Sequence, residues 1–446
     1  MIPYFPFVLF TEDVPVTELM VIRPCACLAA LAAASHSNVE TQTALGDLFN
    51  RMVMAKMSDR QNFSTIDLLQ GLLIHIAWAH YQPRPKRYTQ FLHLATSIVS
   101  DLRLHKPRKP KLWDIDGGKD RDEPDWGPDE MRALIGTYYL STSSSVLLQK
   151  SHHFAFTPYI SHCAERLAML DSAPSDKYLT HIIHFVRLTE NLENAAGEVS
   201  NTPVAWPFTV STQDIFQQCA AAKAALPFSL SESPPLLLHL HMLELLLSQS
   251  TPHGTAFGLD KFDRASWEDQ AGSVEWLSSS ISAVRSIISV MLMLPHGEET
   301  AMSNIGWITL YCGLSLAVRL DIVLSHARFA APVQHLRQFL DITHTLRQVI
   351  LRLEATAASD AEHPFHSLAK RVRRVEDRHK TLLNEMSSHP NQIAQHTMQS
   401  VGTPGSDMSM GGVSLGGQGP GWNQEMGANS MLFSDPFEFL QNLTPY

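Results

Sequence analysis

Histidine is the side chain that offers this sequence the most chemistry, because the chain contains 22 of them. The close pairs that a metal ion could share are His75 with His80, His181 with His184, and His239 with His241. A protein zinc site needs at least a third ligand, and neither an H-E-x-x-H motif nor a carboxylate at a suitable spacing supplies one. We therefore expect these histidines to be core or surface residues, and we expect no metal ion or other cofactor in this chain.

Motifs for nucleophilic catalysis, calcium binding and nucleotide binding fail in their details. The G-x-S-x-G match from Gly412 to Gly416 lies in Gly- and Ser-rich sequence, without the strand and helix that hold a nucleophilic serine. The acidic run from Asp114 would place Lys119 where a calcium loop needs glycine and Asp125 where it needs glutamate. No phosphate-binding glycine motif occurs. We expect no enzyme, and a helical enzyme of unknown class is a remote alternative.

Two basic clusters are candidates for nuclear import signals. The first contains Lys106, Arg108, Lys109 and Lys111. The second contains Lys370, Arg371, Arg373 and Arg374, and continues to Arg378 and Lys380. The alternative is that the first is a solvated loop and the second a solvated helix face, in which Glu376 and Asp377 form intrahelical ion pairs.

Composition limits the class of protein. The chain has 446 residues, of which 44% are hydrophobic and 17% charged, so it can bury a large core. Its formal net charge of −10 disfavours a protein that wraps a phosphate backbone by itself. Five scattered cysteines predict no disulfide framework and indicate a reducing compartment. Without a secretory leader pattern or a long uninterrupted apolar run, we expect an intracellular protein with no membrane contact.

Hydrophobic periodicity predicts helices along most of the chain and gives no sustained alternation typical of strands. We expect an all-α fold in which a large irregular helical domain occupies 1–385, with packed helices from about residue 15. Pro24 opens a helix over 24–35, and Ser64 is the expected N-cap of a central apolar helix that Pro83 terminates. The stretch HLRQFLDITHTLRQVILRLEA reads as one continuous helical pattern.

The composition changes near residue 386. Residues 386–430 are rich in Gly, Ser, Gln and Met and predict a disordered linker. Residues 431–446 form an acidic and aromatic tail that is a candidate activation segment, because such a composition can fold onto a partner. Its candidate contact residues are Phe433, Asp435, Phe437, Glu438, Phe439 and Leu440.

The order of these segments resembles the middle homology region of fungal binuclear-zinc-cluster transcription factors. The resemblance covers about 4–355. It is carried by Arg23-Pro24 with CLAALAAASH, then LLQGLLIHIAWAHYQ, LATSIVSDLRLHKP, EMRALIGTYYLSTSSSVLL and SDKYLTHIIHFVRLTENL, and later by LHMLELLL and SSSISAVRSIISVMLMLP. Members of that family normally carry a six-cysteine cluster that binds two zinc ions before this region. No C-x-x-C pair occurs in this sequence, so the resemblance implies zinc only if an upstream cysteine cluster exists.

The resemblance implies a nuclear transcription regulator, pathway-specific for a secondary-metabolite or catabolic gene cluster, that contacts a coactivator or the transcription machinery. Contact with DNA is then expected through an upstream segment or a partner, and homo- or heterodimers with family members are expected. The alternative is a DNA-binding-deficient interaction protein that forms heterodimers with intact family members.

Overall fold

The computed structural model describes residues 2–10, 14–58, 64–81, 87–107, 126–148, 154–201, 212–251, 270–325, 330–357 and 363–388. Within these ranges the chain forms α-helices and short 3₁₀ helices and has no β-strand, so the predicted all-α fold is confirmed. The predicted linker beyond residue 388 and the predicted tail lie outside the described residues.

The helices, in chain order, are α1 (Val16–Ile22), α2 (Pro24–Ala34), α3 (Val39–Ser58), α4 (Ile66–Ala77), α5 (Tyr88–Asp101), α6 (Pro128–Leu148), α7 (Pro158–Leu170), α8 (Asp176–Asn201), α9 (Thr212–Ala224), α10 (Pro234–Gln249), α12 (Gln270–Met293), α13 (Asn304–Leu324), α14 (Ala330–Leu340), α15 (Ile342–Ala357) and α16 (Pro364–Ser388). The 3₁₀ helices are η1 (Ile2–Tyr4), η2 (Ala79–Tyr81), η4 (Leu230–Glu232) and η6 (Glu298–Ala301).

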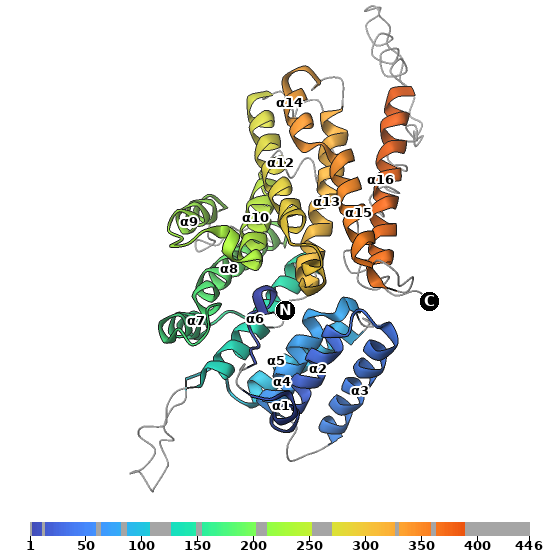
Figure 1. Ribbon diagram of the computed structural model, residues 1–446. Coiled ribbons are helices and arrows are strands. Elements are labelled where there is room, and N and C mark those ends of the chain that lie inside the picture. The colour runs from blue at the N-terminus through green and yellow to red at the C-terminus, as the bar shows by residue number, and fades with distance from the viewer. Residues whose placement is uncertain are drawn as a thin grey trace, which may run out of the picture.

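The helices form two groups that meet at α6. Figure 1 shows α1 to α5 together in the lower part of the molecule and α10 and α12 to α16 in the upper part, with α7, α8 and α9 along the left side. One continuous cluster of buried apolar side chains runs through both groups, from Tyr4 to Val375. The described helices therefore share a single core, as expected for an irregular helical domain rather than a stack of repeats.

The segment before α1 is part of this core. Phe5 and Phe7 are fully buried, and their rings contact Trp78 at 5.7 Å and Tyr139 at 4.6 Å between centroids. A Cβ atom at Gly136 would lie 2.6 Å from that of Phe7, so glycine allows α6 to approach the segment closely. The core thus begins earlier than the start near residue 15 that helical periodicity indicates.

The start of α4 differs from the prediction by one residue. Thr65, not Ser64, is the N-cap, and its hydroxyl accepts a hydrogen bond from the Leu68 backbone N–H at 3.2 Å. The Ser64 hydroxyl instead donates to Asp101 at 2.8 Å. Thr65 has the extended backbone that an N-cap requires. The α-helix ends at Ala77 and η2 follows, so it stops before the predicted proline boundary at Pro83.

Asp67, in the first turn of α4, caps a different helix. Its two carboxylate oxygens accept hydrogen bonds from the backbone N–H groups of Cys25, at 3.0 Å, and Ala26, at 2.9 Å, in the first turn of α2. Four N–H groups at a helix start have no intrahelical partner, and a carboxylate there also interacts favourably with the helix dipole. A Cβ at Gly71 would lie 2.8 Å from the Cys25 backbone, so glycine permits this close crossing of α2 and α4.

The predicted continuous helix over 335–355 is two helices. Asp341 separates α14 from α15 with a φ of 36°, in the left-handed region. Its carboxylate accepts a hydrogen bond from the His344 backbone N–H at 3.4 Å, so it also caps the start of α15. The break turns α15 back so that it packs along α16 (Figure 1).

Two core helices are as long and as apolar as membrane spans. Within the described residues these are α12 from Gly272 and α13, and the most apolar windows of the two are 56% and 72% buried inside the fold. Much of their apolar surface is therefore used in the protein core.

Candidate functional site

Some of the candidate site residues predicted from the sequence lie within the described ranges, and others lie outside them. Lys106, just after α5, is exposed, whereas Arg108, Lys109 and Lys111 lie outside the described residues. The second cluster, Lys370 to Arg374, lies on α16. All six candidate residues of the acidic and aromatic tail, Phe433 to Leu440, lie outside the described residues. The candidate site that the structure describes is therefore centred on α16.

One face of α16 is polar and the other is buried. Phe365, Leu368, Val372 and Val375 are buried in the core. At three- and four-residue spacings, Lys370, Arg373, Arg374 and Asp377 are exposed, and Arg371 is half-buried. This amphipathic pattern is typical of a helix that covers a core. The predicted intrahelical pairing is present, because Lys380 Nζ lies 2.7 Å from Glu376 and 4.0 Å from Asp377.

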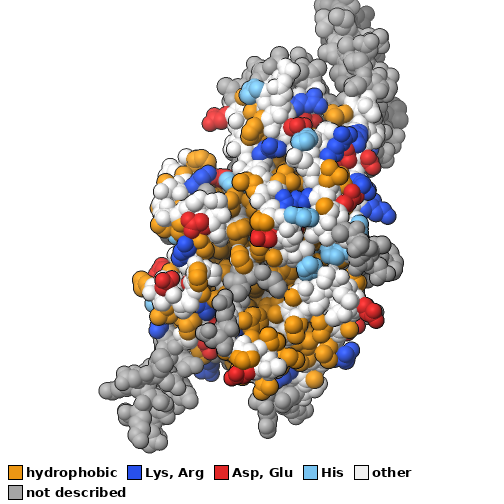
Figure 2. All heavy atoms as spheres, viewed as in Figure 1, with side chains coloured by type: hydrophobic (Ala, Val, Ile, Leu, Met, Phe, Trp, Pro, Cys, Tyr) orange, Lys and Arg blue, Asp and Glu red, His pale blue; other side chains and the backbone are white. Residues whose placement is uncertain are grey.

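Two ion pairs join α16 to α15. Arg347 Nε lies 3.4 Å from Glu376, and Arg373 Nη2 lies 2.5 Å from Glu354. Leu351 lies between them on α15 and keeps 65% of its surface exposed. We call the exposed side chains of Arg347, Leu351, Lys370, Arg373 and Arg374 the basic face. Figure 2 shows Lys and Arg side chains gathered over α15 and α16, with hydrophobic side chains among them.

A buried carboxylate fixes α16 to the core. Asp321 of α13 contacts His379 at 2.8 Å and Arg337 of α14 at 3.0 Å. Burial alone would raise the pKa of Asp321, but the hydrogen bonds from His379 and Arg337 hold that pKa below its usual value. The carboxylate therefore stays charged at neutral pH and links α13, α14 and α16.

Arg352 positions α15 in the same way. It pairs with the fully buried Glu299 of η6, and it donates hydrogen bonds to the carbonyls of Leu292, at 2.6 Å, and Leu294. Leu292 lies in the last turn of α12, where helical acceptors have no intrahelical donor, and Leu294 follows the helix. One planar guanidinium thus satisfies a buried carboxylate and a helix end, which a lysine could not do with the same geometry.

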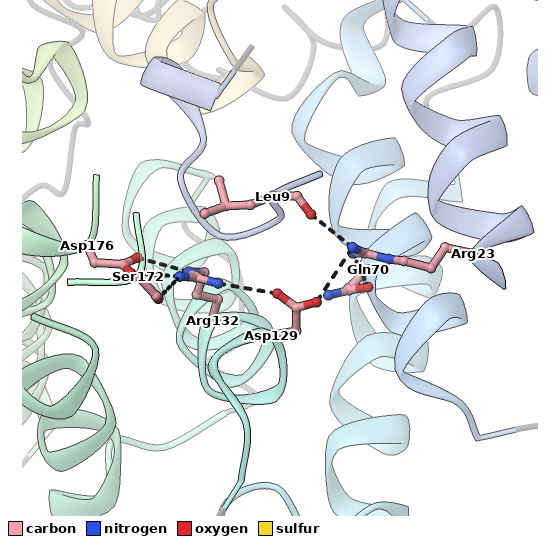
Figure 3. Close-up of polar contacts among 7 residues, drawn as sticks. All are labelled: Leu9, Arg23, Gln70, Asp129, Arg132, Ser172 and Asp176. Carbon is pink, nitrogen blue, oxygen red and sulfur yellow. Dashed lines mark hydrogen bonds and ion pairs between the residues drawn. The ribbon is translucent and has the colours of Figure 1, made fainter. Parts of the chain in front are cut away.

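A second polar network connects the lower group of helices to α6 and α8 (Figure 3). Arg23 donates to the carbonyl of Leu9 at 2.9 Å and to Gln70, and lies 3.5 Å from Asp129. Asp129, in the first turn of α6, also contacts Arg132 at 3.2 Å.

Arg132 completes this network at α8. It binds both carboxylate oxygens of the fully buried Asp176, at 2.9 and 2.6 Å, and the Ser172 hydroxyl at 2.6 Å. Fork-shaped pairing of this kind fixes orientation as well as charge. The Ser172 hydroxyl also donates to Asp176 at 3.0 Å, and Arg132 pairs with both groups, so we assign this arrangement to holding the helices together. No sequence motif predicts this network, because its members come from segments far apart in the chain.

A cavity at the centre of the fold is too small for an effector. It is lined by residues that include Tyr4, Tyr139, His239, Ser303 and Thr309, and its volume is about 10 Å³, close to that of one water molecule. The ring Nε2 of His239 lies 2.9 Å from the hydroxyl of Tyr139. Burial lowers the pKa of His239 to about 4, so this ring is neutral at pH 7.

The histidine pairs do not meet in metal-binding geometry. Across the residues that the structure describes, no group of three or more His, Cys, Asp or Glu side chains is arranged to hold a metal ion. His75 stacks on Phe49 at 4.6 Å, and His181 meets the edge of Phe228 at 5.2 Å. His241 contacts Glu244 at 2.7 Å.

The chain is similar to curated proteins that are named as fungal transcription factors. Transcription factor himD of Aspergillus japonicus is 30% identical over 393 residues, which cover 84% of this chain and 64% of that protein. Transcription factor opdL of Penicillium oxalicum is 23% identical over 42% of this chain and 36% of its own length. Transcription factor pbcR of Emericella nidulans is 26% identical over 46% of this chain and 29% of its own length.

The chain spans less than two thirds of himD and about a third of each of the other two relatives. No protein-family profile and no solved structure matches it. The match to himD nevertheless extends over most of the chain, including most of its helices. The chain is a homologue of fungal transcription factors.

Proposed function

We propose that this protein is a transcription regulator of a fungal gene cluster, with secondary metabolism or catabolism as the controlled pathway. The observation that carries the proposal is the match to himD over 84% of the chain, because so long a match cannot rest on a single short motif. The resemblance of the ordered helical segments to the middle homology region supports the same function. We further propose that the protein acts in the nucleus, where the basic clusters would serve import.

The proposed mechanism uses the tail to contact the transcription machinery. Phe433, Phe437, Phe439 and Leu440 enter an apolar groove of a coactivator, and Asp435 and Glu438 steer the encounter through their charge. Aromatic anchors beside acidic residues suit a contact that forms quickly and dissociates quickly. The helical body positions the tail and mediates dimer formation with the same chain or with a related one.

DNA contact in this proposal is supplied by a partner chain or by a segment outside this sequence. The absence of any C-x-x-C pair from these 446 residues supports that assignment. The same observation favours the second candidate function, in which the protein forms heterodimers with intact family members and tempers their activity. Co-expression separates the two, because a tempering partner lowers the output of an intact relative whereas an activator does not.

A reporter assay tests the role of the tail. The 446-residue chain is fused to an unrelated DNA-binding domain that carries its own nuclear import signal, and reporter output is measured at matched protein levels. We expect activation by the parent chain and loss of activation when Phe433, Phe437, Phe439 and Leu440 are all replaced by alanine.

The matched control replaces four apolar residues of the linker, Met408, Met410, Val413 and Leu415, by alanine. This variant should activate like the parent. Equal output from the tail variant and the parent would remove the tail from the mechanism, and silence of both the full chain and the isolated tail would contradict activation altogether.

A further inference from the structure

Three histidine side chains meet where the lower group of helices contacts the start of α16 (Figure 1). His36 follows the end of α2, His80 belongs to η2, and His363 directly precedes α16. The rings of His36 and His363 lie edge to face with centroids 6.0 Å apart. Tyr81 contacts His36 at 5.7 Å, His80 at 4.2 Å and the ring of Phe365, in the first turn of α16, at 6.2 Å. We call His36, His80 and His363, together with Tyr81, the histidine joint.

The environment of His80 suits a neutral ring and opposes a charged one. The side chain is 1% exposed, and neither ring nitrogen has a hydrogen-bond partner among the described residues. A neutral imidazole can be buried in this way, whereas an imidazolium would be a buried charge without a partner. Burial, together with repulsion from His36 and His363, lowers the pKa of His80 to about 3.

His363 adds a second requirement for a neutral ring, at the start of α16. Its Nδ1 accepts a hydrogen bond from the Phe365 backbone N–H at 3.2 Å, as an N-cap side chain does. A protonated ring carries hydrogen on both nitrogens and cannot accept this bond. The helix dipole also opposes a cation at this end of a helix. Protonation of His363 would therefore remove the cap of α16 and place a positive charge beside His36.

One ion pair of the upper group lies near the joint. Glu299 of η6 acts on Tyr81 through its charge and raises the pKa of that hydroxyl. This carboxylate is already paired with Arg352 of α15 and lies 4.0 Å from the exposed His296. From α13, the uncharged ring of Trp307 packs against the first turn of α16. Of these described neighbours, none is a free counter-ion for an imidazolium in the joint.

We propose that the histidine joint is an acid-sensitive contact, in which uptake of protons by His36, His80 and His363 releases the start of α16 from α2 and η2. Both groups of helices keep their own packing when the joint opens. The second half of α16 stays in place, because His379 remains bound to Asp321 of α13.

The direction of the effect follows from proton linkage. An exposed histidine takes up a proton near pH 6.5, whereas burial in the closed joint lowers the pKa of His36 and of His80. The closed joint is therefore favoured above pH 6.5 and loses stability as the pH falls below that value. His80 alone should raise the equilibrium constant for opening by about tenfold between pH 7.5 and pH 5.5.

Hydrogen exchange of the purified full chain, read by mass spectrometry at pH 7.5 and pH 5.5, tests the proposal. After correction for the intrinsic rate, peptides that cover η2 and the first turns of α16 should exchange at least tenfold faster at pH 5.5. Peptides from the interior of α4 and α6 should change much less. The measurement needs no reporter, so its outcome does not depend on the proposed function.

Two variants assign the effect to the joint. His80→Phe keeps a ring against Tyr81 and cannot titrate, so the pH effect should shrink by about tenfold. His363→Asn keeps a side-chain oxygen that can cap α16 and does not titrate, so the start of the helix should stay protected at pH 5.5. The second variant keeps the test decisive if the first fails to fold.

The matched control is His75→Phe, because His75 is buried in α4 against Phe49 and lies outside the joint. Opening of the joint should keep its full pH effect in this variant. An equal pH effect in the parent, His80→Phe and His363→Asn would overturn the proposal. So would equally faster exchange in α4 and α6, or a reduction by His75→Phe as large as that by His80→Phe, because both would indicate unfolding of the whole domain.

Discussion

Three buried histidines have environments that change their ordinary chemistry. Burial lowers the pKa of His75 and of His239 to about 4, and that of His80 to about 3. Electrostatic repulsion from His36 and His363 lowers the pKa of His80 further. Each ring is therefore neutral in the folded protein at pH 7.

The pH dependence of stability follows from these three pKa values. These histidines take up protons near pH 6.5 in the unfolded chain but only near pH 3 to 4 in the folded chain. Stability is therefore lost as the pH falls from about 6.5 towards 3 to 4. Each histidine lowers the free energy of unfolding by about 1.4 kcal/mol for every pH unit below 6.5. The three together lower it by roughly 6 kcal/mol at pH 5. Urea midpoints at pH 7 and pH 5 measure this loss.

A single substitution identifies the histidines as the source. His75→Phe keeps an aromatic ring against Phe49 and removes one titrating group, so the loss between pH 7 and pH 5 should shrink by about a third. An unchanged loss in that variant would assign the pH dependence to other groups.

At the level of elements, sequence pattern locates most helices but not the connections that tertiary contacts create. The helix at 24–35 and the amphipathic α16 follow from Pro24, from helix-forming composition and from three- and four-residue spacing. The break at Asp341 has no glycine or proline to mark it. Its left-handed backbone persists because α14 and α15 are each held elsewhere, by Arg337 to Asp321 and by Arg352 to Glu299.

The contacts of Arg352 with Glu299 and with the carbonyls of Leu292 and Leu294 should stabilise the upper group of helices. Arg352→Met leaves the buried Glu299 and the carbonyls at the end of α12 without their donor, so the free energy of unfolding should fall by about 3 kcal/mol. Arg347→Met is the matched control, because Arg347 is exposed and Glu376 keeps Lys380 as a partner at 2.7 Å, so this pair should be worth less than about 1 kcal/mol. Chemical denaturation measures both, and equal effects would contradict the assigned role.

The candidate site can be predicted only in part from the sequence, because some of its contacts are created by the tertiary fold. The pattern places the basic residues of 370–374 on a solvated helix face, where Lys370, Arg373 and Arg374 are exposed and Arg371 is half-buried. It cannot place Arg347 against α16, because this residue comes from a different helix and meets α16 only through the α15–α16 packing. The polar network from Arg23 to Asp176 is likewise a product of the tertiary fold.

At the scale of the whole molecule, one segment connects both groups of helices. Phe5 contacts Trp78 just after α4 and Phe7 contacts Tyr139 of α6, while Tyr4 donates a hydrogen bond to Glu298 of η6 at 2.8 Å. The first residues of the sequence and the upper helices therefore belong to one cooperative core. Helical periodicity could not reveal this, because the segment is too short to show a period.

Removal of one ring from this segment should destabilise the whole domain. Phe7→Ala should cost about 3 to 5 kcal/mol, since it leaves a cavity between Tyr139 and Gly136. Near-ultraviolet and far-ultraviolet circular dichroism should lose signal at the same lowered urea midpoint. Phe10→Ala, at a half-buried position, should cost less. A change confined to part of the helical signal would show that the two groups unfold separately.

The bond from Tyr4 to Glu298 joins residues 294 positions apart, which has a consequence for synthesis in the cell. At about 5 to 20 residues per second, the ribosome makes the apolar segment roughly 15 to 60 seconds before η6 exists. During that interval Phe5 and Phe7 lack much of their final environment. The domain can close only after the ribosome has made η6, so the nascent chain exposes an apolar segment to chaperones throughout this interval.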